Sequence, residues 1–397
     1  MLTPLLSVII PVHNTAPWLR TCLDSVCRQT YQHLDIICVD DGSTDGSLDI
    51  LREYEKNDPR IRVLSQPNRG QGAARNAALQ ICQGEFITGL DADDYLLPET
   101  YETCLTAMEN DVDIVCFGIR CVAAPGDEAL IANIDYTQPY EGKQPVSTEL
   151  ITRTGVNFVN KIWRRSLVAR GSGQFCEGLR YEDNYFYFTT IPYARHITYL
   201  PHKFYQRLMR SNSTMGSTFS AKTTQGMEHL MVTERILDFY VARGWHHSHR
   251  ELFCHIILNS LRFIFNSTPD NWANEASTIA AYVIRKHNLD TIFPKEKLLR
   301  QLIEKHYSPA PQHKNPLPAI TPGKRSIKLL SIPLWSERRD SHSIKRKLLG
   351  ITIYSLRQSA FDYRIKTPFL KETDRYKQYR FFGIPLMKRK KLRYSPF

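Results

Sequence analysis

The sequence predicts an α/β protein with a mostly parallel sheet covered by helices on both faces, followed by a helical region and a basic tail. Apolar strands and helical stretches alternate through residues 6–96. Strands that are apolar along their whole length are typical of a sheet buried on both faces. Small and acidic residues follow the strands, as expected where ligands bind beyond the carboxyl ends of parallel strands.

The elements follow one another in a regular order. Each strand is a short apolar run stopped by polar or small residues, and a helix follows after a turn. The predicted strands are residues 6–12, 34–39, 61–64 and 86–90, and the predicted helices are residues 17–28, 48–56 and a third that ends at Ile81.

Polar residues after the second and third strands suit a nucleotide. Asp40 can accept from the imide N–H of a uracil or from a ribose hydroxyl, or it can cap the following helix. Gly70 and Gly72 allow close approach to the backbone. Arg75 is expected in the first turn of the next helix, where its guanidinium is either free for a base or phosphate or simply solvated.

The fourth strand brings Asp91, Asp93 and Asp94 to the same edge of the sheet. Carboxylates this close repel one another unless a cation or a donor-rich ligand lies between them. A divalent metal with a diphosphate is the expected occupant, and a turn or helix cap before Pro98 is the alternative. Neither GxGxxG after the first strand nor GxxxxGK[S/T] occurs, so a sugar nucleotide fits better than a dinucleotide or ATP.

Four motifs in this order, SVIIPVHN, VDDGSTDGS, NRGQGAARNAAL and LDADDYLLP, resemble those of family 2 glycosyltransferases. The resemblance covers residues 5 to about 215 and implies the Rossmann-like GT-A fold and an inverting reaction. By motif position, Asp40 would hold the uracil or ribose, Asp91 the ribose, and Asp93 a Mn²⁺ or Mg²⁺ ion. His13 stands where the family usually has Tyr or Phe behind the nucleotide.

The family's acidic pair resembles Glu182-Asp183, which follows a glycine-bearing loop at residues 171–178. The resemblance implies that Asp183 is the general base and that Glu182 supports it or contacts the acceptor. The alternative is that the pair caps a helix over residues 184–191.

Two basic segments resemble those that bind the departing diphosphate, one at Lys161 and one over residues 204–214, where Arg207 and Ser213 would belong to a flexible lid. Arg164, Arg165 and Arg210 are explained equally well as surface residues, and His202 is either a metal ligand or structural. The full expected donor-binding set is Pro11, His13, Asn14, Asp40, Asn68, Gly70, Arg75, Asp91, Ala92, Lys161, Arg207 and Ser213.

Composition indicates an intracellular enzyme of several parts. Nine cysteines without a CxxC pair suggest free thiols. We expect no signal peptide, because the first strand begins almost at once, and no membrane span, because no run of about 20 apolar residues occurs. The expected parts are a catalytic domain over residues 1–218, a helical region over 219–308, a Pro-rich linker over 309–322 and a basic tail over 323–397. Within the helical region, residues 252–265 have apolar residues at helical spacing and are expected to pack on the catalytic domain or a partner.

The positive charge is concentrated in the tail. Residues 321–397 hold 20 Lys+Arg and 5 Asp+Glu, leaving 32 and 35 in the first 320 residues, so the tail is +15 and the rest −3. Three segments, 328–335, 347–354 and 380–387, repeat a pattern of one basic residue, two apolar residues, Gly or Ser, Ile, any residue and two apolar residues. They are either apolar wedges for an anionic membrane surface or strands of a small accessory domain.

The sequence therefore predicts a metal-dependent, inverting hexosyltransferase acting on a UDP-sugar and a glycan or lipid-linked acceptor. Lipopolysaccharide, capsule or exopolysaccharide synthesis at the cytoplasmic membrane face is the expected setting, with no nucleic acid partner. One alternative is a non-catalytic sugar-nucleotide or glycan-binding module, against which Asp93 and Asp183 argue. Another is a nucleotidyltransferase, which is expected to carry a Gly-rich basic loop after the first strand.

Overall fold

The computed structural model divides the chain into two compact units, Met1–Ser308 and Pro309–Phe397. The predicted linker 309–322 and Ser213 lie outside the described residues, and the predicted domain boundaries stay predictions. The described residues are 3–124, 126–131, 138–210, 225–267, 323–329, 332–340, 343–348, 351–359, 362–366, 370–372, 376–381 and 384–390.

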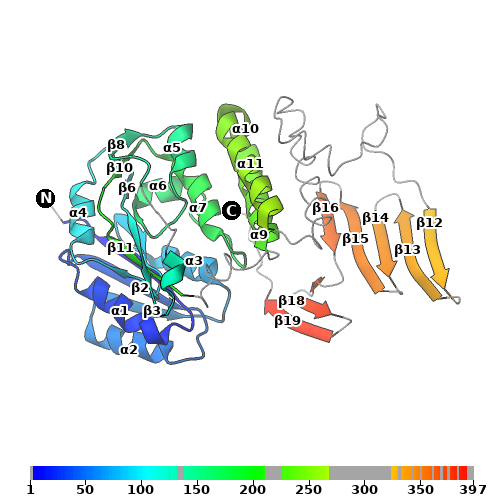
Figure 1. The fold of residues 1–397 in the computed structure, drawn as a ribbon, viewed down its shortest axis with the longest axis horizontal. Coiled ribbons are helices and arrows are strands. Elements are labelled where there is room, and N and C mark those ends of the chain that lie inside the picture. The colour runs from blue at the N-terminus through cyan, green and yellow to red at the C-terminus, as the bar shows by residue number, and fades with distance from the viewer. Residues whose placement is uncertain are drawn as a thin grey trace. The chain divides into compact units, whose positions relative to one another are not determined.

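An eight-stranded sheet forms the centre of the first unit, in the order β3-β2-β1-β4-β9-β6-β10-β8 (Figure 1). Neighbours among β1 to β4 run parallel, as do β6 and β10, whereas β9 and β8 run antiparallel to their neighbours. The predicted mostly parallel α/β class is therefore confirmed. The strands are β1 (Leu6–Val12), β2 (Leu34–Asp40), β3 (Ile61–Ser65), β4 (Phe86–Gly89), β6 (Ile114–Cys116), β8 (Gly142–Pro145), β9 (Lys161–Arg164) and β10 (His196–Tyr199).

Helices cover both faces of this sheet. Successive residues of a strand point to opposite faces, so neighbouring residues of β1 pack against different helices. Ile9 of β1 belongs to the same core as Ala74 of α3 (Gln71–Ile81). Its neighbour Val8 belongs to a second core with Leu19 of α1 (Ala16–Cys27) and Leu51 of α2 (Ser47–Asn57). The sheet edge that carries the polar loops is thus held between two packed layers.

The second half of the unit adds shorter elements around the site. A three-stranded sheet has the order β5-β11-β7, with β11 parallel to β7. The elements are β5 (Tyr95–Leu96), α4 (Thr100–Thr106), β7 (Ile119–Ala123), η1 (Glu128–Ile131), α5 (Thr148–Arg153), α6 (Arg165–Arg170), α7 (Glu182–Thr190), η2 (Ile191–Tyr193) and β11 (Tyr205–Met209).

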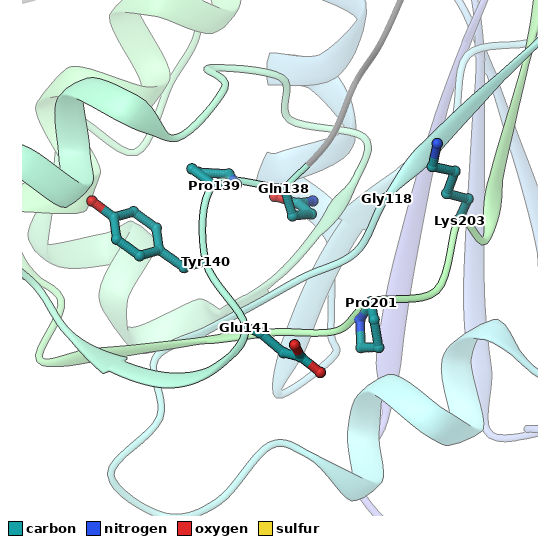
Figure 2. A pocket seen from close by; sticks show the side chains of 7 residues that line it. All are labelled: Gly118, Gln138, Pro139, Tyr140, Glu141, Pro201 and Lys203. Carbon is teal, nitrogen blue, oxygen red and sulfur yellow. The ribbon is translucent and has the colours of Figure 1, made fainter.

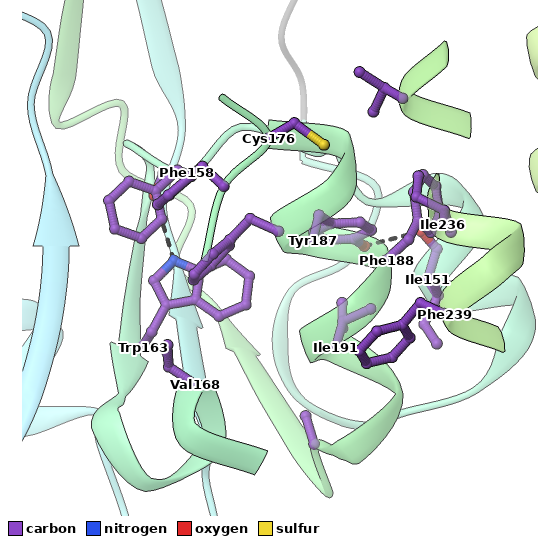
Figure 3. Close-up of a cluster of buried hydrophobic side chains, with 14 of the residues drawn as sticks. Ile151, Phe158, Trp163, Val168, Cys176, Tyr187, Phe188, Ile191, Ile236 and Phe239 are labelled. Carbon is purple, nitrogen blue, oxygen red and sulfur yellow. Dashed lines mark hydrogen bonds between the residues drawn. The ribbon is translucent and has the colours of Figure 1, made fainter. Parts of the chain in front are cut away.

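The helical region packs on the catalytic unit, as predicted for residues 252–265. It contains α9 (Gln225–Ala242), α10 (Trp245–Ser248) and α11 (Arg250–Ser267). Ile236 and Phe239 of α9 lie in the same buried cluster as Tyr187 of α7 and Trp163 of β9 (Figure 3). Within the described part of the chain, no helix has the length and apolarity needed to cross a bilayer. All nine cysteines are free thiols, as predicted, and Cys38 and Cys116 are buried.

In the second unit, the three sequence repeats lie in three β-hairpins that share the same pairing pattern. The closing pairs are Leu329–Ile332, Leu348–Ile351 and Phe381–Ile384, each across a two-residue connection, and each hairpin has a register shift two residues before its closing pair. The described residues of the repeats therefore form strands, and their contact with an anionic membrane stays a prediction. The strands are β12 (Gly323–Leu329), β13 (Ile332–Asp340), β14 (Ser343–Leu348), β15 (Ile351–Ser359), β16 (Asp362–Lys366), β17 (Leu370–Glu372), β18 (Tyr376–Phe381) and β19 (Ile384–Lys390).

Candidate active site

Two adjacent aspartates at the end of β2 organise the first loops of the site. Asp40 is buried, and its two carboxylate oxygens accept from Ser43 N at 3.1 Å and from Ser65 Oγ at 2.9 Å. Each oxygen has a second lone pair, so the predicted acceptance from a uracil or ribose is compatible with these bonds. The helix-cap alternative is wrong, because α2 begins after Gly46 with no side-chain cap, and the bond from Ser43 closes the turn after β2 instead.

Asp41 is a structural residue of the site that the sequence reading missed. Its carboxylate accepts from Gln66 Nε2 at 2.7 Å, Arg69 N at 2.8 Å and Gly70 N at 2.7 Å. These bonds fix the loop before α3, in which Gly70 has a left-handed φ of 88°. The doubled aspartate before Gly42 was the available signal.

The loop after β1 faces this second loop. Pro11 is the penultimate residue of β1, and His13 Nδ1 lies 3.0 Å from Asp41 O while its Nε2 lies 3.0 Å from Asn68 Nδ2. A tautomer with the hydrogen on Nδ1 satisfies both contacts. Asn14 has a positive φ of 52° and accepts from Thr44 N at 2.8 Å. The predicted residues of the donor edge are therefore neighbours in space.

Arg75 differs from its prediction. It is neither solvated nor free for a phosphate, since it is only 2% exposed. Nη1 donates to Glu182 Oε1 at 2.7 Å and to Asp183 Oδ1 at 2.9 Å, and Nη2 donates to Asp91 Oδ1 at 2.8 Å. The reason is physical: an arginine on the buried face of α3 needs carboxylate partners, and these come from residues far along the chain.

The acidic pair opens α7, as the helix-cap reading also required. Asp183 accepts from Phe158 N at 3.2 Å in addition to Arg75. Burial raises the pKa of Glu182 to about 7 and raises the pKa of Asp183, while the positive charge of Arg75 lowers both. The pair therefore has the raised proton affinity expected of a general base in a partly dry cleft.

The residues after β4 form a second acidic cluster. Asp91 accepts from Gln71 Nε2 at 2.8 Å, and Ala92 is buried beside it. Asp93 pairs with Arg210, and burial followed by the charge of Asp91 raises the pKa of Asp93. Asp94, which had no assigned role, binds β11 instead, accepting from Tyr205 Oη at 2.6 Å and Leu208 N at 2.7 Å.

A divalent metal fits this cluster if its ligands come partly from the protein and partly from the substrate. Among the residues that the structure describes, no three Asp, Glu, His or Cys side chains are placed to hold a metal by themselves. Mg²⁺-type sites commonly use one or two carboxylates and take their other ligands from substrate phosphates and water. Asp93 therefore suits the predicted metal. His202 does not belong to a metal cluster, because its ring stacks on Phe204 at 4.9 Å between centroids.

The basic residues predicted to bind the diphosphate are placed differently. Lys161 is fully buried, and Nζ donates to Gly155 O, Asn157 O and Asn160 Oδ1 at 2.6–3.0 Å, so all three of its hydrogens support the loop before β9. Burial lowers the pKa of Lys161. Arg207 belongs to strand β11 rather than to a flexible lid, and Arg210 is an ion-pair partner rather than a surface residue. Arg164 is also structural, donating to Val112 O and Glu109 O.

Helix α3 joins the two halves of the site through Gly72 and through Asn76, for which the sequence predicted no role. A Cβ on Gly72 would lie 2.1 Å from Cys176 O, so only glycine allows this approach. Asn76 donates to Phe175 O at 3.0 Å and accepts from Phe175 N at 2.7 Å, which pairs the helix with the loop before α7. Gly72 thus touches the protein's own backbone rather than a ligand.

A pocket of about 410 Å³ is lined by none of the predicted site residues (Figure 2). Its lining is Gly118, Gln138, Pro139, Tyr140, Glu141, Pro201 and Lys203.

Known proteins share this fold and these motifs. Residues 7–167 match the family model described as Glycosyl transferase family 2. The chain is similar to chondroitin synthase of Pasteurella multocida (strain Pm70), with 28% identity over 267 residues, which are 67% of this chain and 26% of that protein. It is also similar to glycosyltransferase GlyG of Streptococcus pneumoniae serotype 4 (strain ATCC BAA-334 / TIGR4), with 40% identity over 116 residues, 29% of this chain and 38% of that one. The chain thus spans less than two thirds of these relatives.

The crystal structure of S. aureus TarS 1–349 in complex with UDP-GlcNAc is similar with a TM-score of 0.50 and 21% identity, covering 75% of this chain and 91% of that chain. This likeness confirms the predicted GT-A fold. The relatives' names bear out the predicted family resemblance.

Proposed function

We propose that the protein transfers a sugar from a UDP-sugar to a hydroxyl of a glycan or lipid-linked saccharide, with inversion, on the basis that residues 7–167 match the family model described as Glycosyl transferase family 2. One contact supports this most. The guanidinium of Arg75 binds Asp91 of the donor edge and Asp183 of α7 at once. The proposed base, Asp183, and the proposed donor ligand, Asp91, are thereby both bound to the guanidinium of Arg75.

In the proposed reaction, the oxygen of the acceptor hydroxyl attacks the anomeric carbon from the face opposite the diphosphate. Asp183 takes the hydroxyl proton as the new C–O bond forms. The bond from the anomeric carbon to the diphosphate oxygen breaks, and its electron pair leaves with UDP. One displacement inverts the anomeric centre, so no covalent enzyme intermediate is needed.

Glu182 is proposed to support the base. Its carboxylate shares Arg75 Nη1 with Asp183, and like charges in one site do not ionise independently. With the pKa of Glu182 raised to about 7 by burial, the pair is suited to keep one proton while Asp183 acts.

A bound Mn²⁺ or Mg²⁺ would neutralise charge on the departing diphosphate. We propose that Asp93 holds it, with Asp91 beside it on the ribose. Arg210, which pairs with Asp93, and Arg207 on β11 are cations of the same chain near this turn. The nucleoside would bind at the strand ends and loops that follow β1 to β4. The proposed donor-edge residues there are Pro11, His13, Asn14, Asp40, Asn68, Gly70 and Ala92.

The direct test is UDP release from a panel of UDP-sugars with and without Mn²⁺ or Mg²⁺. UDP-GlcNAc is the first member because the TarS structure contains it. Metal-dependent release from at least one sugar nucleotide is expected. Failure of every UDP-sugar to bind or react would contradict the proposal, and pyrophosphate release from UTP with a sugar phosphate would favour a nucleotidyltransferase.

We also propose that the second unit holds the enzyme at an anionic surface at the cytoplasmic face of the membrane. The register pairs Lys324 with Arg338 and Arg338 with Lys345 in the antiparallel sheet β12–β16. Like charges directly opposite one another on neighbouring strands are destabilising, and an anionic partner offsets this. Phosphate headgroups are such a partner, with roughly 1 kcal/mol per basic residue near the surface.

A further inference from the structure

The residue before the proposed catalytic pair has an unusual backbone. Tyr181, the N-cap of α7, has φ 64° and ψ 28°, in the left-handed region. A residue with a Cβ is strained there, so the surroundings must hold it. Asn14 is the other non-glycine residue with positive φ among the described residues, and it too lies at the proposed site.

Two helices from the region after residue 224 hold the Tyr181 ring. His229 of α9 contacts it edge-on, with centroids 5.1 Å apart at 67°, and Phe263 of α11 does so at 5.4 Å and 76°. The His229 and Phe263 rings lie 4.7 Å apart. Such aromatic pairs are stabilising beyond the area that they bury, so the two ring contacts oppose the backbone strain at Tyr181.

The histidine of this cluster is itself fixed. His229 Nδ1 lies 3.1 Å from Ser260 Oγ, and Thr233 Oγ1 donates to the same oxygen at 2.8 Å. Burial lowers the pKa of His229 to about 4, so the ring is neutral at ordinary pH. It therefore acts as an aromatic contact rather than as a charge.

Glu228, which precedes His229 in α9, binds Arg180, which precedes Tyr181. Glu228 Oε2 accepts from Arg180 N at 2.9 Å. Consecutive residues 228 and 229 thus contact consecutive residues 180 and 181, which fixes both the direction of the chain and the start of α7. Downstream, Tyr240 Oη donates to Phe188 O at 2.9 Å, a contact that joins α9 to α7 away from the acidic pair.

We propose that Glu228, His229 and Phe263 form a positioning clamp, which sets Tyr181 in its left-handed conformation and so aims Glu182 and Asp183 at the donor edge. The inference rests on the proposed function, in which Asp183 is the base. Without the clamp, Tyr181 relaxes to negative φ and the first turn of α7 rotates. The Asp183 contacts to Arg75 at 2.9 Å and Phe158 N at 3.2 Å are then lost.

The test compares Phe263→Ala and Tyr181→Ala with Tyr181→Phe, which keeps the ring, and with Tyr240→Phe as a matched control on the same helix interface. We measure kcat and donor KM for UDP release from the fastest UDP-sugar of the panel, the Kd for UDP, and Tm. The two alanine variants should lose about 10- to 100-fold in kcat with UDP affinity unchanged, as small misplacements of reacting groups do. Tyr181→Phe should stay within about threefold of wild type, since the rings still meet.

A clamp that is only structural gives a different pattern. If Phe263→Ala lowers kcat no more than Tyr240→Phe at equal loss of Tm, the proposal is overturned. Hydrogen exchange of the amides at 182–184 gives a reading that does not depend on Asp183 being the base. Faster exchange there in Phe263→Ala supports the clamp even if Asp183→Asn keeps full turnover, whereas unchanged exchange overturns it.

Discussion

The two halves of the candidate site are built in different ways. The donor half lies on loops after β1, β2, β3 and β4, whose strands are adjacent in the sheet. Asp41, after β2, holds the loop after β3 through bonds to residues 25 and 29 positions away. In the other half, Glu182 and Asp183 are held by Arg75, 107 and 108 residues away. Strand ends position the first half, and a buried arginine positions the second.

This difference predicts where substitutions act. A change in the donor half removes a ligand contact, so it alters binding and turnover together. A change in the contact of α3 with the loop before α7 leaves the donor loops in place, so it alters turnover or stability while UDP affinity is kept. A change at Arg75 also removes the bond to Asp91, so it alters donor binding as well as turnover.

The largest effect is expected for Asp93→Asn. The carboxylate is the proposed protein ligand of the metal, so the variant should lose turnover by about 10²-fold or more and bind UDP more weakly in Mn²⁺. Calorimetric titration of UDP with and without Mn²⁺ measures this. A variant that keeps full turnover removes the metal assignment.

Arg75→Met is expected to lower turnover by about 10- to 100-fold and to change its pH dependence. The arginine charge lowers the pKa of Asp183 and Glu182. Without it both carboxyls keep their protons to higher pH, so the acid limb of kcat should move upward. Turnover measured from pH 5 to 9 checks this shift, and Arg75→Lys keeps a charge but not the forked geometry. An unchanged limb would show that Arg75 does not act on the base.

Gly72→Ala should act on stability more than on chemistry. The new methyl would lie 2.1 Å from Cys176 O, and relieving that overlap costs about 1–3 kcal/mol. Gly46→Ala is the control, because nothing lies within 4 Å of its Cβ position. Thermal unfolding of both variants compares them, and equal Tm values would mean that the contact between α3 and the loop is not tight.

The smallest effect on donor chemistry is expected for removal of residues 321–397. The remaining chain carries a formal charge of −3 instead of +12, so its UDP release should survive while its binding to vesicles of anionic lipid falls sharply. Full-length binding should weaken as salt rises, because charges are screened over about 8 Å at physiological ionic strength. Equal vesicle binding by both proteins contradicts the surface proposal.

The sequence predicted the first half of the molecule well and the basic residues poorly. Strands at 6–12 and 86–90 were recognisable because fully buried strands are continuously apolar, and the aspartates at their ends follow from parallel topology. The partners of Arg75 in α7 lie 107 and 108 residues away and are brought close by tertiary packing, which no local pattern reports. The partners of Lys161 lie within six residues of it, in the loop before β9. A lysine in the apolar run Lys161-Ile162-Trp163 was nevertheless a signal of burial.

We propose above all that Asp183, held by Arg75, is the base of an inverting sugar transfer. The measurement that tests it most directly is kcat for UDP release together with the Kd for UDP in Asp183→Asn and Glu182→Gln. We expect Asp183→Asn to lose turnover by about 10²-fold or more at unchanged UDP affinity, and Glu182→Gln to lose less. Loss of UDP affinity in step with rate in Asp183→Asn, or a larger rate loss in Glu182→Gln, would contradict the claim and make Glu182 the base.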